Sequence, residues 1–228
     1  PLNGYLAYED STEVPHPAVL VVHEWWGHND YARKRARMLA ELGYTALAVD
    51  MYGKGKQAAH PTEAGAFAGE VKKNRDVMKA RFLAALEFLK KEPRVDPKKI
   101  AAIGYCFGGS VVLEMAKEGL DLDAVASFHG SLASEHSAQP GNVKAKILVA
   151  HGGADSFISP MEIEAFKNDL DAAGADYQFV VYKGAKHSFT NPDADKYAKE
   201  FGMDIAYNPE ADQKSWQDMV AFLKKVFK

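Results

Sequence analysis

The chain's only cysteine, Cys106, lies in a pattern that suits a catalytic nucleophile. It stands at the centre of the sequence GYCFG, with an apolar, strand-like stretch before it and a helix-like stretch, residues 110–117, after it. This is the form of a nucleophile elbow, a tight strand-to-helix turn that exposes the reactive side chain. The positive end of the following helix favours a thiolate there. The alternative is that a lone cysteine simply packs as a small apolar residue.

An acid and a histidine follow Cys106 in the order that an elbow nucleophile requires. Residues 145–151 have the pattern of a buried strand and lead to Asp155, and residues 177–182 have the pattern of the next strand and lead to His187. Active sites of parallel sheets form at the carboxyl ends of the strands, so we expect all three side chains to meet there. His187 would then be the base and Asp155 the group that orients it.

Each of these two residues also has a plainer interpretation. Asp155 could be a turn residue before the helix predicted to begin near residues 159–162, and His187 could be a surface loop histidine. If Asp155 is not the acid, Asp50 is the first alternative. The coincidence of all three residue types at strand ends nevertheless favours a Cys-His-Asp triad.

A hydrolytic triad also needs donors for the oxyanion that forms on the substrate. The first is expected to be the backbone N–H of Phe107, directly after the nucleophile. A short buried strand, residues 18–22, leads into the loop 23–28, where the N–H of Trp25 is the candidate for the second donor. Glu24 lies beside it in sequence and could reach the thiol.

Four motifs together resemble the dienelactone hydrolase family, the cysteine branch of the α/β-hydrolases. They are EWWG at 24–27, GYCFGG at 104–109, GAD at 153–155 and HSF at 187–189, and the match runs over nearly the whole chain. The resemblance implies that Cys106, Asp155 and His187 are the triad. It further implies that Glu24 interacts with the resting thiol and helps to deprotonate it when substrate arrives.

The chain departs from that family at the substrate. Members that cleave dienelactone hold its carboxylate with two arginines, one after the HSF motif and one before the central helix. Here Phe189 is followed by Thr-Asn-Pro, and residues 52–74 contain lysines but no arginine. We therefore expect a small neutral ester or lactone as substrate, with weak side activity on phosphotriesters; a true dienelactone (carboxymethylenebutenolide) hydrolase is the alternative.

The same departure removes the arginine partner that the family provides for Glu24. The plainer interpretation of Glu24 is that it braces its loop by pairing with Arg33 or Arg35. Aromatic residues flank the four motifs and suggest an apolar pocket for aryl or short acyl groups, although several of them must belong to the core. The candidate pocket residues are Trp26, Tyr105, Phe128, Phe157 and Phe189.

The rest of the chain has the alternating elements of an α/β protein. We expect one α/β-hydrolase domain over residues 1–228, with a mostly parallel central sheet, helices on both faces and no separate cap domain. Two segments, 52–69 and 190–208, resist assignment and are interpreted as pocket walls or a lid, or else as plain surface loops. The predicted strands are 4–8, 19–22, 45–50, 99–103, 124–128, 146–150 and 178–182.

Composition and charge limit the classes of partner that we expect this protein to bind. The formal net charge is −3 with acidic and basic residues interleaved, which indicates neither a nucleic-acid footprint nor a membrane patch. The longest apolar runs are strand-sized. One cysteine makes no internal disulfide, and the chain begins at Pro1, so a cytoplasmic protein and a periplasmic protein with a removed signal peptide both fit. A monomer and a homodimer fit equally well.

Two rivals belong to other classes. Three histidines, His23, His129 and His151, follow predicted strands at the same edge of the sheet as Cys106, with His28 and His187 nearby. This clustering raises the alternative of a metal-dependent hydrolase. No metal-ligand spacing motif connects these histidines, so we expect neither a metal nor any other cofactor. A non-catalytic binding module of the same fold is the second rival, but such a module normally loses a triad residue.

Overall fold

The computed structural model describes residues 1–10 and 14–228. Seven strands of this part form a sheet in the order β1-β3-β2-β4-β5-β6-β7. β1 pairs antiparallel with β3, and the other neighbours are parallel. The strands are β1 (Tyr5–Ala7), β2 (His16–Val22), β3 (Thr45–Val49), β4 (Val95–Tyr105), β5 (Ala124–Phe128), β6 (Lys146–Gly152) and β7 (Tyr177–Tyr182).

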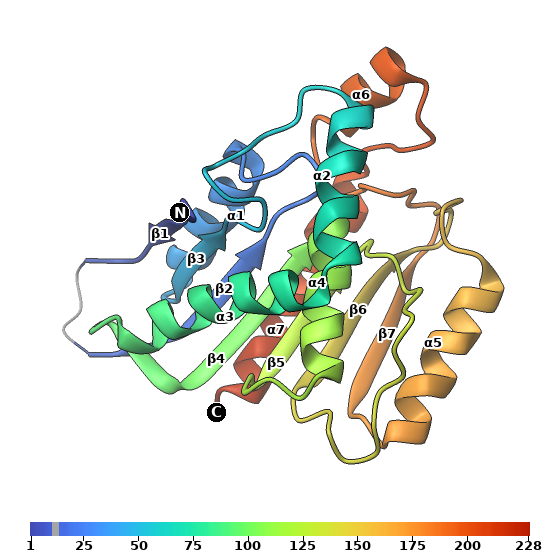
Figure 1. Cartoon of the computed structure of the whole chain (residues 1–228). Coiled ribbons are helices and arrows are strands. Elements are labelled where there is room, and N and C mark those ends of the chain that lie inside the picture. The colour runs from blue at the N-terminus through green and yellow to red at the C-terminus, as the bar shows by residue number, and fades with distance from the viewer. Residues whose placement is uncertain (11–13) are drawn as a thin grey trace.

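Helices cover both faces of the sheet (Figure 1). α1 (Asp30–Ala40) and α7 (Pro209–Val226) pack on one face, and α3 (Arg75–Lys91), α4 (Phe107–Lys117) and α5 (Pro160–Ala173) pack on the other. This arrangement confirms the predicted α/β-hydrolase fold, and every predicted strand overlaps an observed one. The largest difference is at β4, which begins at Val95, four residues before the expected start.

The burial of β2 on both of its faces explains why this strand lies inside the sheet. Residues 18–22 of this strand are all completely buried. Their side chains alternate, so that Leu20 joins the core under α3 and α4 whereas Val19 and Val21 join the core under α1 and α7. Burying one such side chain contributes about 1.5–3 kcal/mol, so a strand buried on both faces is held firmly in register.

Segment 52–69 holds the first nine residues of a helix that continues to Lys73, and segment 190–208 holds a whole helix. α2 (Pro61–Lys73) begins with proline in its first turn after His60, whose side chain accepts from the backbone N–H of Thr62. α6 (Ala194–Phe201) has eight residues. Figure 1 shows both at the end of the sheet to which the parallel strands point. They pack near the loop 23–28, where Trp26 stacks on Tyr197 of α6 with ring centroids 4.4 Å apart.

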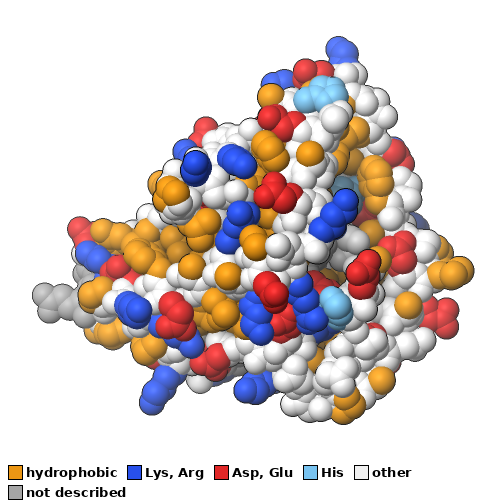
Figure 2. All heavy atoms as spheres, in the orientation of Figure 1, with side chains coloured by type: hydrophobic (Ala, Val, Ile, Leu, Met, Phe, Trp, Pro, Cys, Tyr) orange, Lys and Arg blue, Asp and Glu red, His pale blue; other side chains and the backbone are white. Residues whose placement is uncertain are grey.

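The surface agrees with the interleaved charges of the sequence. Figure 2 shows basic and acidic side chains intermingled across one face of the molecule, with scattered hydrophobic residues between them. Among the described residues, no helix combines the length and the apolar character needed to cross a bilayer.

Candidate active site

The turn between β4 and α4 carries Cys106 in a strained conformation. Its φ of 52° and ψ of −113° are unusual for a residue with a Cβ, and its backbone N–H donates to the Phe128 carbonyl at 3.0 Å. The glycines allow close backbone contacts. A Cβ on Gly104 would lie 2.0 Å from the Gly108 carbonyl oxygen, and one on Gly108 would lie 2.2 Å from that of Val22. The observed turn therefore has the features of a nucleophile elbow.

The structure brings Cys106, His187 and Asp155 together from three strand ends. His187 Nε2 lies 3.2 Å from Cys106 Sγ, and His187 Nδ1 lies 2.8 Å from Asp155 Oδ2. The other carboxylate oxygen, Asp155 Oδ1, accepts the backbone N–H of Phe157 at 3.0 Å. The Asp155 side chain is fully buried and that of His187 is 13 % exposed. Asp155 is thus fixed on both oxygens while the imidazole faces the sulfur.

The electrostatic environment of His187 favours its protonated form. Burial lowers the pKa of this imidazole, but negative charge on Cys106 and the hydrogen bond to Asp155 outweigh burial and raise the pKa to about 10. Asp50, the alternative acid, is occupied elsewhere. Its carboxylate accepts the backbone N–H groups of Asn3, Tyr52, Gly53 and Gly55 and braces that loop.

The loop after β2 lies against the elbow. The N–H of Gly108 donates to the His23 carbonyl at 3.0 Å, which ties the start of α4 to this loop. Within the described residues, neither the N–H of Trp25 nor that of Phe107 donates to a protein acceptor. An oxyanion hole formed by these two N–H groups stays a prediction.

Glu24 is buried, and its partner is an amide rather than the thiol. The Asn191 Nδ2 group donates to Glu24 Oε2 at 2.5 Å, and Oε1 is buried without a hydrogen bond to any described residue. Burial raises the pKa of Glu24 to about 7, although the Asn191 hydrogen bond opposes the shift. Arg33 and Arg35, the proposed bracing partners, instead form ion pairs with Asp30 and Asp212.

The aromatic candidates divide sharply by exposure. Phe157 is 53 % exposed and packs edge-on against the His187 ring, with centroids 5.2 Å apart. The other candidates are core residues rather than lining of an open pocket; Tyr105, Phe128, Phe189 and Trp26 are between 0 and 3 % exposed. The physical reason is strand alternation and packing: Tyr105 stacks on Phe128 in the core beneath α1 and α7, and Trp26 is covered by α6.

The histidines that suggested a metal have other partners. His23 Nδ1 lies 2.6 Å from the Glu24 carbonyl, and its Nε2 accepts the N–H of Met51. His129 Nε2 contacts the Thr190 hydroxyl, and His151 packs against the ring of Phe179. The described residues include no group of three or more His, Cys, Asp or Glu side chains placed to hold a metal ion.

A cavity of about 670 Å³ opens beside the first turns of α4. Ser110, one helical turn after Cys106, lines it, and its buried hydroxyl has no hydrogen-bond partner among the described residues. The wall includes the basic side chains of Lys72, Lys73 and Arg75 and the acidic side chains of Glu114 and Glu135. Arg75 is paired with Glu118. Sequence reasoning missed this cavity and the role of Asn191, because both depend on packing between distant segments.

The chain is similar to proteins of one hydrolase family. A model of the dienelactone hydrolase family matches residues 2–227. A protein of Aquifex pyrophilus named usf is 32 % identical over 92 % of this chain and 88 % of its own length. A provisionally named carboxymethylenebutenolidase of Aquifex aeolicus is 30 % identical over 100 % of this chain and 94 % of its own.

A solved structure extends the likeness to three dimensions. It is a dienelactone hydrolase-like promiscuous phosphotriesterase from metagenomic libraries, with a TM-score of 0.92 and 34 % identity, over 99 % of this chain and 92 % of that one. The sheet, its helical layers, the elbow and the sequence matches lead to one assignment. The chain belongs to the dienelactone hydrolase family, and it is a hydrolase of the class that acts on carboxylic ester and lactone bonds.

Proposed function

We propose that this protein hydrolyses small neutral esters or lactones through a Cys106-His187-Asp155 triad. The observation that carries the proposal is the continuous contact from Asp155 Oδ2 through the His187 ring to Cys106 Sγ, at 2.8 and 3.2 Å. The strained backbone at Cys106 adds support, because such strain is retained where it serves to present a side chain. No cofactor is needed for this chemistry.

The proposed reaction has two halves. The Cys106 thiol first gives its proton to His187 Nε2, and the resulting thiolate attacks the carbonyl carbon. The oxyanion that forms accepts hydrogen bonds from the N–H groups of Trp25 and Phe107. His187 gives its proton to the departing alcohol oxygen, which leaves a thioester on Cys106. A water molecule then attacks the thioester as His187 takes its proton, and the acid product leaves as the thiolate is restored.

Glu24 enters this scheme as the group that assists deprotonation of the thiol. In the resting arrangement its carboxylate is held by Asn191, so it must release that hydrogen bond before it can act on Cys106. Its pKa of about 7 would let it take up a proton near neutral pH. The competing view is that Glu24 only shapes the loop that presents Trp25. Alkylation of Cys106 measured against pH in Glu24→Ala separates the two, because matching wild-type and variant profiles would reduce Glu24 to the shaping role.

The absence of arginine from residues 52–74 and from the residues directly after Phe189 supports a neutral substrate. In the cavity wall Arg75 is already paired with Glu118. The carboxylates of Glu114 and Glu135 stand in the same wall as the ammonium groups of Lys72 and Lys73, and neither lysine has the planar fork by which an arginine binds a carboxylate. A buried substrate carboxylate without a paired cation is costly. We therefore expect kcat/KM to be lower for an anionic dienelactone than for a neutral ester of similar size. The reverse ranking would favour a true dienelactone hydrolase.

A weaker phosphotriesterase activity is the second candidate function. It is favoured by the 34 % identical structure, which is described as a promiscuous phosphotriesterase. The same two N–H donors could hold a phosphoryl oxygen, and the same thiolate could attack phosphorus. The expected observation is slow release of nitrophenol from a nitrophenyl phosphotriester, with covalent phosphorylation at Cys106.

One variant tests the shared nucleophile of both activities. Cys106→Ala should abolish turnover of p-nitrophenyl butyrate and of the phosphotriester, and iodoacetamide should inactivate the wild type at one equivalent per chain. Retention of more than a few per cent of esterase activity by a purified, folded Cys106→Ala protein would refute the assignment. Cys106→Ser should also turn over poorly, because a hydroxyl deprotonates far less readily than a thiol.

A further inference from the structure

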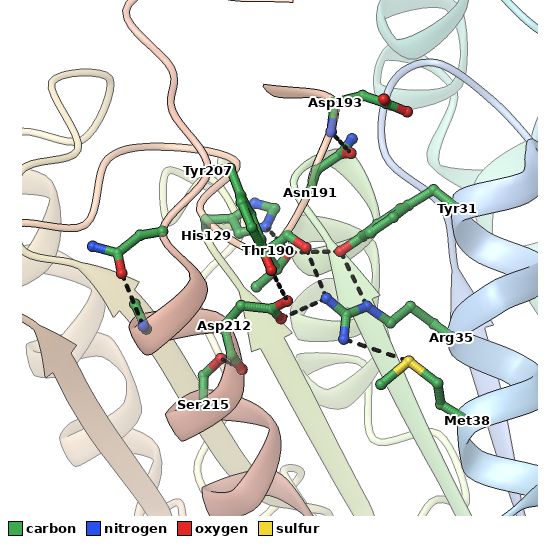
Figure 3. Close-up of polar contacts among 12 residues, drawn as sticks. Tyr31, Arg35, Met38, His129, Thr190, Asn191, Asp193, Tyr207, Asp212 and Ser215 are labelled. Carbon is green, nitrogen blue, oxygen red and sulfur yellow. Dashed lines mark hydrogen bonds and ion pairs between the residues drawn. The ribbon is translucent and has the colours of Figure 1, made fainter. Parts of the chain in front are cut away.

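A buried network of polar groups runs from Asp212 of α7 to His129 (Figure 3). Asp212 Oδ1 accepts from Arg35 Nη2 at 2.5 Å, and Arg35 Nε donates to the Tyr31 hydroxyl at 3.3 Å. The Tyr31 and Thr190 hydroxyl oxygens are 2.6 Å apart, and Thr190 Oγ1 is 2.7 Å from His129 Nε2. Arg35, Thr190 and His129 are between 0 and 3 % exposed.

The donors in this polar network fix the direction in which its hydrogen bonds run. A guanidinium can only donate, so the Tyr31 oxygen accepts from Arg35 and its own proton is available for Thr190. The Thr190 hydroxyl, having accepted that proton, can donate to His129 Nε2. Every hydroxyl proton is then used, which a buried network favours, and the one group of the network left without a partner among the described residues is His129 Nδ1. An Nε2–H on His129 would instead leave one hydroxyl proton of the Tyr31–Thr190 pair without an acceptor, in addition to the unpartnered Nδ1.

The last member of this network touches the catalytic histidine. The His129 and His187 rings meet edge-on with centroids 5.3 Å apart, and Phe157 packs on His187 at 5.2 Å. His187 is therefore held between two rings. Burial and the charges of His187 and Arg35 keep the pKa of His129 well below its ordinary value, so this neighbouring ring is neutral. A neutral His129 ring adds no charge repulsion when His187 is protonated to an imidazolium.

We propose that Tyr31, Thr190 and His129 form a positioning relay, oriented by Arg35, that presents a neutral His129 ring to His187. The relay fixes His129 with its proton on Nδ1 and its plane set by the Thr190 hydroxyl. It thereby holds the His187 imidazole in line with Cys106 Sγ. Arg35 also donates to the Thr190 carbonyl at 2.8 Å, so Thr190 is tied at both its backbone and its side chain. The inference rests on the proposed function, since it assigns His187 as the base.

Isosteric removal of single hydroxyls tests the relay. Tyr31→Phe and Thr190→Val should each lower kcat for p-nitrophenyl butyrate about tenfold and change KM by less than about twofold, because orientation of the base acts on the chemical step. Thr190→Ser keeps the hydroxyl and should stay within about twofold of wild type. The matched control is Tyr177→Phe, which removes a tyrosine–carboxylate hydrogen bond of 3.0 Å, to Asp171, at the far end of β7.

Nitrogen-15 NMR of the histidines supplies a readout that a merely structural role would not move. Wild-type His129 should show a protonated Nδ1 and an unprotonated Nε2, and this pattern should be lost in Thr190→Val. An Nε2-protonated His129 in the wild type would overturn the inference, as would unchanged kcat in both hydroxyl variants or a loss in Thr190→Ser equal to that in Thr190→Val. Failure of the proposed function would appear separately, as an active Cys106→Ala protein.

Discussion

At the scale of single residues, the site combines an unusual backbone with ordinary hydrogen bonds. Cys106 and His129 both have positive φ angles, 52° and 40°, and each lies directly after a parallel strand. Such conformations cost on the order of 1–3 kcal/mol each and persist where the surroundings enforce them. Here the two residues flank His187 from different strands. The strain therefore coincides with the side chains proposed to do the chemistry.

The proposed base, His187, and its orienting acid, Asp155, should both be needed for full turnover. His187→Ala removes the proton acceptor, so kcat for p-nitrophenyl butyrate is expected to fall by about 10³-fold or more. Asp155→Asn keeps the base but loses the carboxylate at 2.8 Å from Nδ1, and the expected loss is similar or somewhat smaller.

A neighbouring carboxylate provides the control for this comparison. Asp204 is exposed and accepts hydrogen bonds from Lys186 and Ser156, close to the same loops but away from the His187 ring. Asp204→Asn should leave kcat within about twofold of wild type, since it touches none of the proposed catalytic groups. Wild-type kcat in Asp155→Asn would mean that another residue orients the imidazole.

At the scale of elements, the elbow depends on backbone segments that pack directly against one another, with almost no side chains between them. Gly104 faces the backbone of Gly108, Gly108 faces Val22, and Gly109 faces Gly130 and the Ser127 hydroxyl. These contacts bring β2, β4, β5 and the start of α4 close enough for the Trp25 loop and the elbow to share one site. Glycine is required by close approach here, and not by a positive φ.

Two glycines in helices separate this requirement from general helix propensity. In Gly108→Ala the new Cβ would lie 2.2 Å from the Val22 carbonyl oxygen, so the free energy of unfolding should fall by about 3 kcal/mol or more. Gly69→Ala in α2 meets no heavy atom within 4 Å and should raise it by roughly 0.5–1 kcal/mol. Urea unfolding of both variants measures the difference, and equal effects would contradict the packing argument.

At the scale of the whole molecule, burial of Glu24 couples the site to global stability. The carboxyl is 2 % exposed and its pKa is raised from 4.5 to about 7. The native state therefore holds this proton after the unfolded chain has lost it. The contribution of Glu24 to the free energy of unfolding falls as pH rises from about 4.5 to 7, by up to about 3 kcal/mol.

A neutral replacement should reveal that dependence. Glu24→Gln carries no charge, so its free energy of unfolding relative to wild type should be about 2 kcal/mol more favourable at pH 8 than at pH 5. Comparing two pH values cancels any packing change that does not depend on pH. Glu87→Gln, at an exposed position on α3, controls for the loss of one carboxylate. The same difference at both pH values would show that Glu24 ionises equally in both states.

The sequence alone was sufficient for the fold and for the order of the proposed catalytic residues. Local signals carried both: apolar strand-sized runs such as residues 18–22, and glycines around Cys106 that only a tight turn needs. The strand ends then indicated Asp155 and His187, because parallel strands present their carboxyl ends at one edge. These inferences depend on short-range patterns and on the order of the residues along the chain, and both can be read directly from a sequence.

Only the tertiary structure decided which side chains surround that site. The helix α2 contains two glycines and α6 has only eight residues, so neither has a strong local helix signal. Both lie near the loop that carries Trp26. The aromatic residues expected in the pocket are mostly in the core, since exposure depends on what covers a residue. Asn191 meets Glu24 across 167 positions, and Arg35 meets Asp212 across 177. Contacts over such separations have no local pattern, because they arise when packed layers bring distant segments together.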